Sequence, residues 1–226
     1  MPDLVLTTAT LRTPKAAAIA GIAFSVLLSI AFVLLKISVP ADPLERGAWL
    51  KTDSDTVVIA LNIIPFAGIA FLWFIGVLRD RLGQREDRFF ATVFFGSGLL
   101  FLAMLFAAAA MVGAIILVFA EQPEELVNSA TFHFARATIY NLVNIYMIKM
   151  AAVFIISTST VAGFAPRWIA FLGYGLAVLI LFGSAYLTWG FIVFLMWVLL
   201  ISSYILFRQL EARLKRRVGQ DQPSGP

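Results

Sequence analysis

The sequence predicts an all-α membrane protein: a polytopic transmembrane bundle of six helices with both termini in the cytoplasm. Hydrophobic residues make up 61% and charged residues 13% of the 226 residues, whereas soluble domains are nearer half apolar and a quarter charged. The apolar residues also form long uninterrupted runs, such as Ala16–Leu35 and Phe89–Ala120, which contain no charged residue. A helix of about 20 apolar residues crosses the roughly 30 Å hydrocarbon core of a bilayer. These runs therefore predict membrane crossings.

Six apolar segments are interpreted as transmembrane helices. They cover residues 16–38, 56–78, 89–119, 130–160, 168–187 and 191–207, which together form one transmembrane domain over 16–207. Residues 1–15 form a cytoplasmic segment before this domain, and residues 208–226 form a basic cytoplasmic tail after it. The first apolar run is longer than the 7–15 residues typical of a cleaved signal peptide, so we interpret it as a retained helix.

The first three helices have boundaries that the sequence marks. The first is expected to end before Pro40, because proline cannot continue the hydrogen-bond ladder of a helix. Asp53–Asp55 can cap the free N–H groups at the start of the second. The third is longer than a perpendicular crossing requires, so we expect it to tilt or to project from the bilayer. Its alanines at spacing four favour close packing against another helix: Ala103, Ala107, Ala110 and Ala114.

The last three helices follow polar connections. Pro123–Glu125 resembles the first turn of a helix, so the fourth helix can begin early, with its first turns at the outer interface or in a polar vestibule. The fifth follows Pro166, and the turn at Thr188–Gly190 predicts a tight hairpin between the fifth and the sixth. The tail is basic and places three apolar residues on one helical face, which favours binding to anionic headgroups: Leu210, Leu214 and Val218.

The basic residues predict the orientation of the bundle. Twelve of them fall on one predicted side: Arg12, Lys15, Arg79, Arg81, Arg85, Arg88, Arg167, Arg208, Arg213, Lys215, Arg216 and Arg217. Only three fall on the other side, namely Lys36, Arg46 and Lys51. Because loops rich in Lys and Arg stay in the cytoplasm, both termini are expected there.

The fourth helix carries the most polar residues at membrane depth. At about 100° per residue, four of its side chains fall within about 80° of one another, with Asn141 at the edge of the same stripe: His133, Arg136, Tyr140 and Asn144. Charged groups in a membrane usually face protein or water, so this stripe is expected to point into the bundle or a cavity.

The sequence leaves two interpretations of this polar stripe open. In the first, it lines a pathway for a solute or an ion, where Arg136 attracts an anionic group and His133 exchanges a proton near neutral pH. In the second, the outer turns stand above the hydrocarbon, and these two side chains meet headgroups or pair with Glu124 or Glu125.

Lys149 is the second charged residue of this helix. It lies about thirteen residues beyond Arg136 and on the opposite side of an ideal helix, or roughly 20 Å deeper, near the bilayer midplane. No apolar segment carries an Asp or Glu to pair with it. Its charge therefore needs carbonyl groups, a water-filled cavity, a substrate anion, a partner subunit, the loss of its proton, or a snorkelling path to the interface.

Polar or helix-breaking residues in two other places are weaker candidates. Pro65 frees the carbonyl of Leu61, and this carbonyl together with Asn62 can coordinate a cation or a polar solute. The alternative is a simple kink whose free carbonyl is satisfied by neighbours. Ser157–Thr160 is expected to hydrogen-bond to its own helix.

No pattern in the sequence predicts catalysis. There is no cysteine and a single histidine, and no phosphate-binding or dinucleotide-binding glycine motif is present. Gly96-Ser97-Gly98 lacks the G-x-S-x-G form of a serine nucleophile. We therefore expect no enzyme activity, no metal site and no cofactor. The basic residues lie in short clusters between apolar runs, so the expected partner is the lipid bilayer and not a nucleic acid.

Two stretches resemble a known group of proteins. Phe66–Gly76, followed by Arg79–Gly83 and Glu86–Phe90, is similar to bacterial, actinobacterial-type polytopic inner-membrane proteins of unknown function. The resemblance is best over the first three helices. It implies a bacterial inner-membrane location and carries over no activity and no site residue.

Two classes of function remain after these exclusions. One is a transporter or channel-like protein for a small solute or ion, which predicts that the polar stripe and Asn62 face one hydrated cavity. The other is a non-catalytic accessory or structural subunit, as a homo-oligomer or with a partner membrane protein. That class predicts a dry interior and a Lys149 that faces lipid or a partner.

Overall fold

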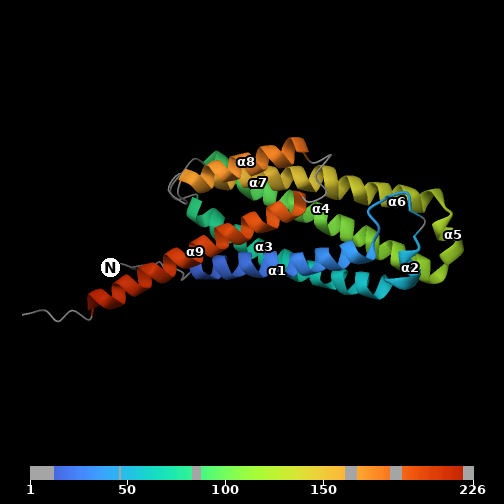
Figure 1. Cartoon of the computed structure of the whole chain (residues 1–226), viewed down its shortest axis with the longest axis horizontal. Coiled ribbons are helices and arrows are strands. Elements are labelled where there is room, and N and C mark those ends of the chain that lie inside the picture. The colour runs from blue at the N-terminus through green and yellow to red at the C-terminus, as the bar shows by residue number, and fades with distance from the viewer. Residues whose placement is uncertain (1–12, 46, 83–87, 161–166, 184–189, 221–226) are drawn as a thin grey trace, which may run out of the picture.

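The chain folds into an elongated bundle of long helices (Figure 1). In the computed structural model, residues 13–45, 47–82, 88–160, 167–183 and 190–220 are described, and every regular element in these ranges is helical. The all-α prediction is therefore confirmed for this part of the chain. The elements are α1 Thr13–Ser38, α2 Trp49–Thr52, α3 Ser54–Leu82, α4 Arg88–Glu121, α5 Pro123–Val127, α6 Ala130–Asn141, the π-helical segment η1 Leu142–Met147, α7 Ile148–Thr160, α8 Arg167–Gly183 and α9 Gly190–Gln220.

Five helical stretches among the described residues are long and apolar enough to cross a membrane. They are Lys15–Ser38, Ser54–Arg79, Ala91–Glu121, Ala130–Thr160 and Gly190–Glu211. The helix predicted as a further crossing, α8, has 17 residues, which at 1.5 Å per residue is about 26 Å. The expected end of that crossing, residues 184–187, lies outside the described residues. The structure thus shows a multi-pass architecture with five such helices, and it does not confirm the predicted sixth crossing.

The long helices alternate in direction along the bundle. The start of α1, the end of α3, the start of α4 and the end of α9 lie at one end (Figure 1). The loop after α1 and the short helices α2 and α5 lie at the opposite end, which is called the loop end below. The two ends of the described chain are therefore on the same end of the molecule.

The last two long helices pack on different neighbours. α8 packs mainly on α7, whereas α9 packs mainly on α1, and α8 and α9 touch only slightly. The two helices therefore do not pack as the close pair that a tight hairpin predicts, and residues 188 and 189 of the predicted turn lie outside the described residues. Small residues explain why α9 prefers α1: the Ser25 hydroxyl donates to the carbonyls of Gly21 and Leu195, at 2.9 and 3.3 Å. A Cβ at Gly21 would collide with the Ser202 hydroxyl, so the two helices approach closely.

A layer of aromatic rings fills the middle of the bundle. It consists of Phe24, Phe71, Phe101, Phe154 and Phe194, one each from α1, α3, α4, α7 and α9, and all are at most 1% exposed. The ring centroids of Phe24 and Phe71 are 4.4 Å apart, and those of Phe101 and Phe194 are 4.6 Å apart. Such tilted and edge-on pairs contribute beyond simple burial. This phenylalanine layer joins five helices into one core.

A second, smaller apolar core closes the loop end. Trp49, Leu50, Val57, Ile115 and Phe132 are buried together there. The loop reaches this core through Gly47, whose φ of 77° favours glycine. A Cβ at this position would also lie 2.8 Å from the Phe132 ring. Gly47 thus allows the loop to fold back tightly onto α6.

Three local features differ from the predictions or extend them. The four alanines of α4 that were expected to pack against another helix are exposed, because α4 presents other residues to α3 and α7: Ala103, Ala107, Ala110 and Ala114. The basic tail is not a separate element, since α9 continues without a break to Gln220, and no glycine or proline interrupts it before Gly219. The hydroxyls of Ser157–Thr160 donate to carbonyls of their own helix, as expected.

Candidate functional site

A pocket of about 720 Å³ opens between the helices near the loop end. Its walls come from α1 and α3 on one side and from α4, α6 and η1 on the other, and the first residues of the loop roof it. The apolar lining includes Leu28, Phe32, Leu105, Ala109, Met147 and Phe191. The polar lining includes Lys36, Ser38, Asp53, Arg136, Tyr140 and Asn144. Its size is within the range of small-molecule sites.

The floor of the pocket rests on the phenylalanine layer. Phe191, the second residue of α9, lines the pocket and stacks on Phe32 of α1, with ring centroids 4.6 Å apart. The same ring lies parallel to that of Phe101 in the layer, at 6.3 Å. The pocket is therefore separated from the opposite end of the bundle by at least two tiers of packed rings.

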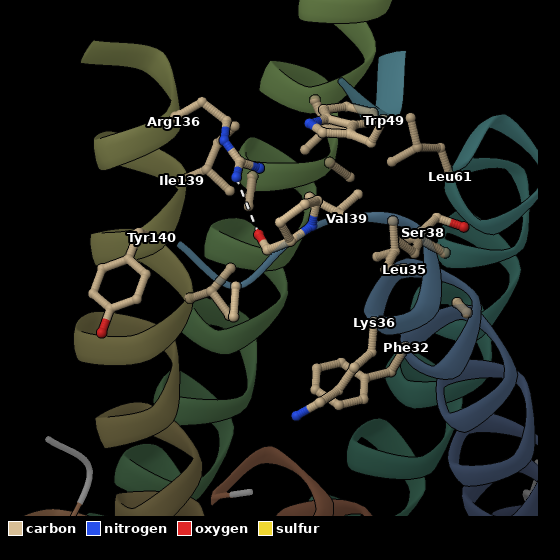
Figure 2. Close-up of a pocket in the computed structure, with 18 of the residues that line it drawn as sticks. Phe32, Leu35, Lys36, Ser38, Val39, Trp49, Leu61, Arg136, Ile139 and Tyr140 are labelled. Carbon is tan, nitrogen blue, oxygen red and sulfur yellow. Dashed lines mark hydrogen bonds between the residues drawn. The ribbon is translucent and has the colours of Figure 1, made fainter. Parts of the chain in front are cut away.

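Arg136 is the most buried charged residue described. Its side chain is 8% exposed. Its guanidinium donates from one terminal nitrogen to the Pro40 carbonyl at 3.1 Å, the dashed line in Figure 2, and to the Asp42 carbonyl at 2.8 Å. These bonds tie the loop after α1 to α6 across more than ninety residues of sequence. Arg136 does not pair with Glu124 or Glu125, as one of the two interpretations of the sequence expected. Both acids are exposed on α5, and the backbone carbonyls of another segment take their place.

The carboxylates closest to Arg136 are committed to the loop backbone. Glu45 accepts from the N–H groups of Gly47 and Ala48, at 2.8 and 3.0 Å, and Asp42 accepts from the N–H of Leu44 at 2.9 Å. Both acids attract the guanidinium through space. They stabilise its charge, while their oxygen atoms shape the loop.

Besides the Ser38 hydroxyl, two buried donors beside the pocket have no hydrogen-bond partner in the described part of the chain. They are the Nε of Arg136 and the indole Nε1 of Trp49. The guanidinium carbon lies 5.9 Å from the Trp49 ring centroid, and the indole nitrogen is on the side of the ring that faces Arg136 (Figure 2). Neither group can accept a hydrogen bond. A buried donor without a partner costs about 1–3 kcal/mol, so a small movement that admits an acceptor to either nitrogen would be favourable.

The other polar side chains that line the pocket point in different directions. The Lys36 side chain extends from α1 into the space between the two walls, whereas the Ser38 hydroxyl points away from Arg136 (Figure 2). Asp53 accepts a hydrogen bond from the neighbouring Thr52 hydroxyl. The lining therefore contains two cationic groups and one carboxylate.

A π-helical segment forms part of the wall below Arg136. η1 covers Leu142–Met147, directly after the polar residues of α6, and the Asn144 amide donates to the Tyr140 carbonyl at 3.0 Å. The predicted single helix over 130–160 thus contains a change of helical type. π-helical turns are rare and occur often at functional sites, because the inserted residue changes which side chains share a face.

The structure divides the predicted site residues into two groups. Arg136, Tyr140 and Asn144 line the pocket. His133, Asn141, Lys149, Asn62 and Pro65 do not. The polar stripe therefore contributes to a cavity through three of its five members, and the expected meeting of this stripe with Asn62 does not occur in the pocket.

The residues outside the pocket have simpler surroundings. Asn62 is exposed and donates to the Val58 carbonyl of its own helix at 2.9 Å. Pro65 is exposed, and α3 continues through it. The His133 ring lies edge-on to Phe132 at 5.5 Å. Lys149 is exposed on the surface of α7.

Sequence reasoning missed part of the pocket lining. Lys36 entered only the count of basic residues, and no sequence pattern singled out Trp49, yet both line the cavity. A usable signal was that Lys36, at the end of the first helix, lies at the same predicted membrane face as Arg136. The carbonyls that hold Arg136 left no such signal, since any residue type carries a backbone carbonyl.

Fold and site together define the class of this protein: an all-helical integral membrane protein of the multi-pass type, with a pocket between its helices near one end. The particular function has to be inferred from the geometry of that pocket. No protein family, no curated protein and no solved structure matches the chain.

Proposed function

We propose that the protein is a carrier-type membrane protein that binds a small anionic molecule in the pocket near the loop end. One observation carries this proposal: the buried guanidinium of Arg136 and the indole of Trp49 each leave an N–H group without a partner beside a pocket of about 720 Å³. Lys36 adds a second positive charge to the same lining. An anion supplies acceptors for both donors and balances this charge.

The interior of the bundle favours a carrier over an open channel. Below the pocket, the rings of Phe101, Phe191 and Phe194 pack against one another at centroid distances of 4.6 to 6.3 Å. A channel needs a continuous hydrated path, whereas a carrier needs a binding site that is closed on one side at a time. The phenylalanine layer is the closure that such a carrier would open.

We further propose a location and an orientation. The resemblance of Phe66–Gly76 and the segments that follow it to bacterial polytopic proteins supports the inner membrane of a bacterium. The twelve basic residues on one predicted side, against three on the other, support cytoplasmic termini. The pocket then faces the outer side, since its loop roof connects α1 and α3.

The test measures uptake of a permanently charged anion into proteoliposomes. Methanesulfonate is suitable because it stays ionised and does not cross the bilayer as a neutral acid. We expect saturable uptake of radiolabelled methanesulfonate, or saturable binding of it to detergent-solubilised protein. Ala109→Phe should abolish either signal by filling the pocket, whereas Leu100→Phe, at a half-exposed position of the same helix, should leave it intact. Equal signals for these two variants would refute the proposed site.

A second function is favoured by a different observation. The exposed alanines of α4 and the exposed Lys149 of α7 are the surfaces expected of an accessory subunit that packs against another membrane protein. This alternative predicts that the purified protein forms a defined oligomer or copurifies with one membrane partner. Ala107→Leu should then disperse the complex, while Ala109→Phe should leave it assembled. A monomer in mild detergent and in nanodiscs would contradict it.

A further inference from the structure

Two elements on opposite walls of the pocket, α1 and η1, are not main packing partners in the bundle. α1 packs against α3 and α9, whereas α6 and η1 pack against α4. α9 crosses one face of the bundle diagonally, and its N-terminal end lies part-way along the molecule (Figure 1). Of the described residues of α8 and α9, Phe191 alone lines the pocket. α1 and η1 therefore face each other across the pocket, in the part of the bundle between the N-terminal end of α9 and the loop end.

The lining changes from polar to apolar along the pocket. Near the loop lie the two unpaired N–H donors of Arg136 and Trp49. Further along, the lining is apolar except for the Lys36 side chain, which lies beside Phe32 (Figure 2), and it includes Met147, Phe191 and the small side chain of Ala109. Arg136 and Met147 are eleven positions apart on one helical stretch, which corresponds to about 16 Å. This is close to the depth of one hydrocarbon leaflet, about half of the roughly 30 Å core.

We infer that the anion bound here is an amphiphile with one acyl chain in the pocket, which it reaches sideways from the bilayer between α1 and η1. The headgroup accepts from Arg136 and Trp49, and the chain lies along the apolar lining toward Phe191. This inference rests on the anion site of the proposed function and names its substrate class. A long-chain carboxylate and an anionic phospholipid share this chemistry.

The geometry favours such a ligand over a small soluble anion for a physical reason. A soluble anion would fill only the polar part of the pocket and would leave the apolar lining against water. An acyl chain covers that lining, and each methylene transferred from water raises affinity about fourfold, from about 0.8 kcal/mol per group. An acyl chain that moves from the bilayer into the pocket gains less free energy, because the bilayer is equally apolar. Its headgroup then provides most of the selectivity.

The experiment uses Trp49 as a reporter in phosphatidylcholine nanodiscs. The full chain carries Phe at the other four tryptophan positions, Trp73, Trp168, Trp189 and Trp197, and circular dichroism checks that it remains helical. Three quenchers, each brominated at the acyl carbon next to the carboxyl or ester group so that the bromine lies near Trp49, are titrated: stearate, phosphatidylglycerol and phosphatidylcholine. We expect saturable quenching of Trp49 by stearate or by phosphatidylglycerol at mole fractions where phosphatidylcholine gives none, and the tighter of the two identifies the source of the ligand.

Matched variants localise the binding. Ala109→Phe should remove the saturable quenching, while Leu100→Phe should not. Lys36→Gln should weaken binding of the anion about tenfold, because it removes one of the two positive charges of the lining, and Lys149→Gln should leave binding unchanged. Equal effects of the two lysine substitutions would contradict the pocket as the binding site.

Three outcomes overturn the inference, and they separate it from the proposed function. If methanesulfonate competes as well as a long-chain anion, the site takes a small soluble anion, so the inference fails and the proposed function stands. If brominated phosphatidylcholine quenches equally, the contact is with ordinary surrounding lipid. If no anion binds in any arm and methanesulfonate is not taken up, both fail.

Discussion

Replacing Arg136 by Met removes the link between α6 and the loop after α1. The native guanidinium donates to the carbonyls of Pro40 and Asp42, at 3.1 and 2.8 Å. A hydrogen bond from a charged group contributes about 1.5–3 kcal/mol. Because both bonds come from one nitrogen and both carbonyls can bind water once released, we expect the closed loop to lose less than the sum of two such bonds, about 2–3 kcal/mol in total.

This loss predicts a measurable change in hydrogen exchange. Each 1.36 kcal/mol corresponds to a factor of ten, so local opening of the loop should become about 30-fold to 150-fold more frequent. The amides that report it are those whose acceptors lie within the loop: Leu44, Gly47, Ala48 and Leu50. Their protection should fall by that factor in detergent or nanodiscs, while amides of the phenylalanine layer keep theirs.

Two further variants serve as controls for the effect of Arg136→Met on loop protection. Lys149→Gln removes an exposed charge from the same helical stretch and should change loop protection by less than about threefold. Arg136→Lys can make one of the two bonds and should give an intermediate value. If Arg136→Met changed loop protection no more than Lys149→Gln does, the two carbonyl bonds would not hold the loop, and our account of the roof of the pocket would be wrong.

Three other substitutions or labels test the packing and the topology. Gly173→Ala should destabilise the protein by about 1–3 kcal/mol in reversible denaturation, because its Cβ would collide with Ser159 and with Trp197, whereas Gly175→Ala, which faces open space, should be neutral. Trp197→Phe should cost about 1 kcal/mol in the same assay, through loss of its buried 2.9 Å hydrogen bond to α7; an unchanged midpoint would show that this bond is dispensable. Because the sequence contains no cysteine, a membrane-impermeant maleimide should label Ala48→Cys in intact cells and Lys15→Cys only after permeabilisation; the reverse pattern would invert the predicted orientation.

Hydropathy alone was sufficient to predict the helical class and most helix positions. The predicted helices over 16–38, 56–78 and 89–119 correspond to α1, α3 and α4, each extended by a few residues. This works because a membrane-crossing helix needs an uninterrupted apolar run, which is visible in a single sequence. The polar stripe was also a useful signal, since it contributed Arg136, Tyr140 and Asn144 to the pocket.

The remaining features depend on contacts that a sequence pattern does not carry. The π-helical turn at Leu142–Met147 changes which residues share a face, so an ideal helical wheel misplaces residues beyond it, including Lys149. The bonds from Arg136 to Pro40 and Asp42 are made to backbone carbonyls, which every residue has. The alanine spacing in α4 predicted close packing against another helix, but the folded bundle leaves these alanines exposed, because α4 turns other residues toward its neighbours.

The phenylalanine layer has an electrical consequence. Its five rings are at most 1% exposed and meet across the bundle from five helices, and moving an unpaired ion into such an apolar medium costs tens of kcal/mol by simple solvation estimates. A membrane potential of about 100 mV supplies only about 2.3 kcal/mol per elementary charge. In this conformation the layer is therefore an electrical barrier across the described part of the bundle, and the membrane potential alone does not drive an ion through it.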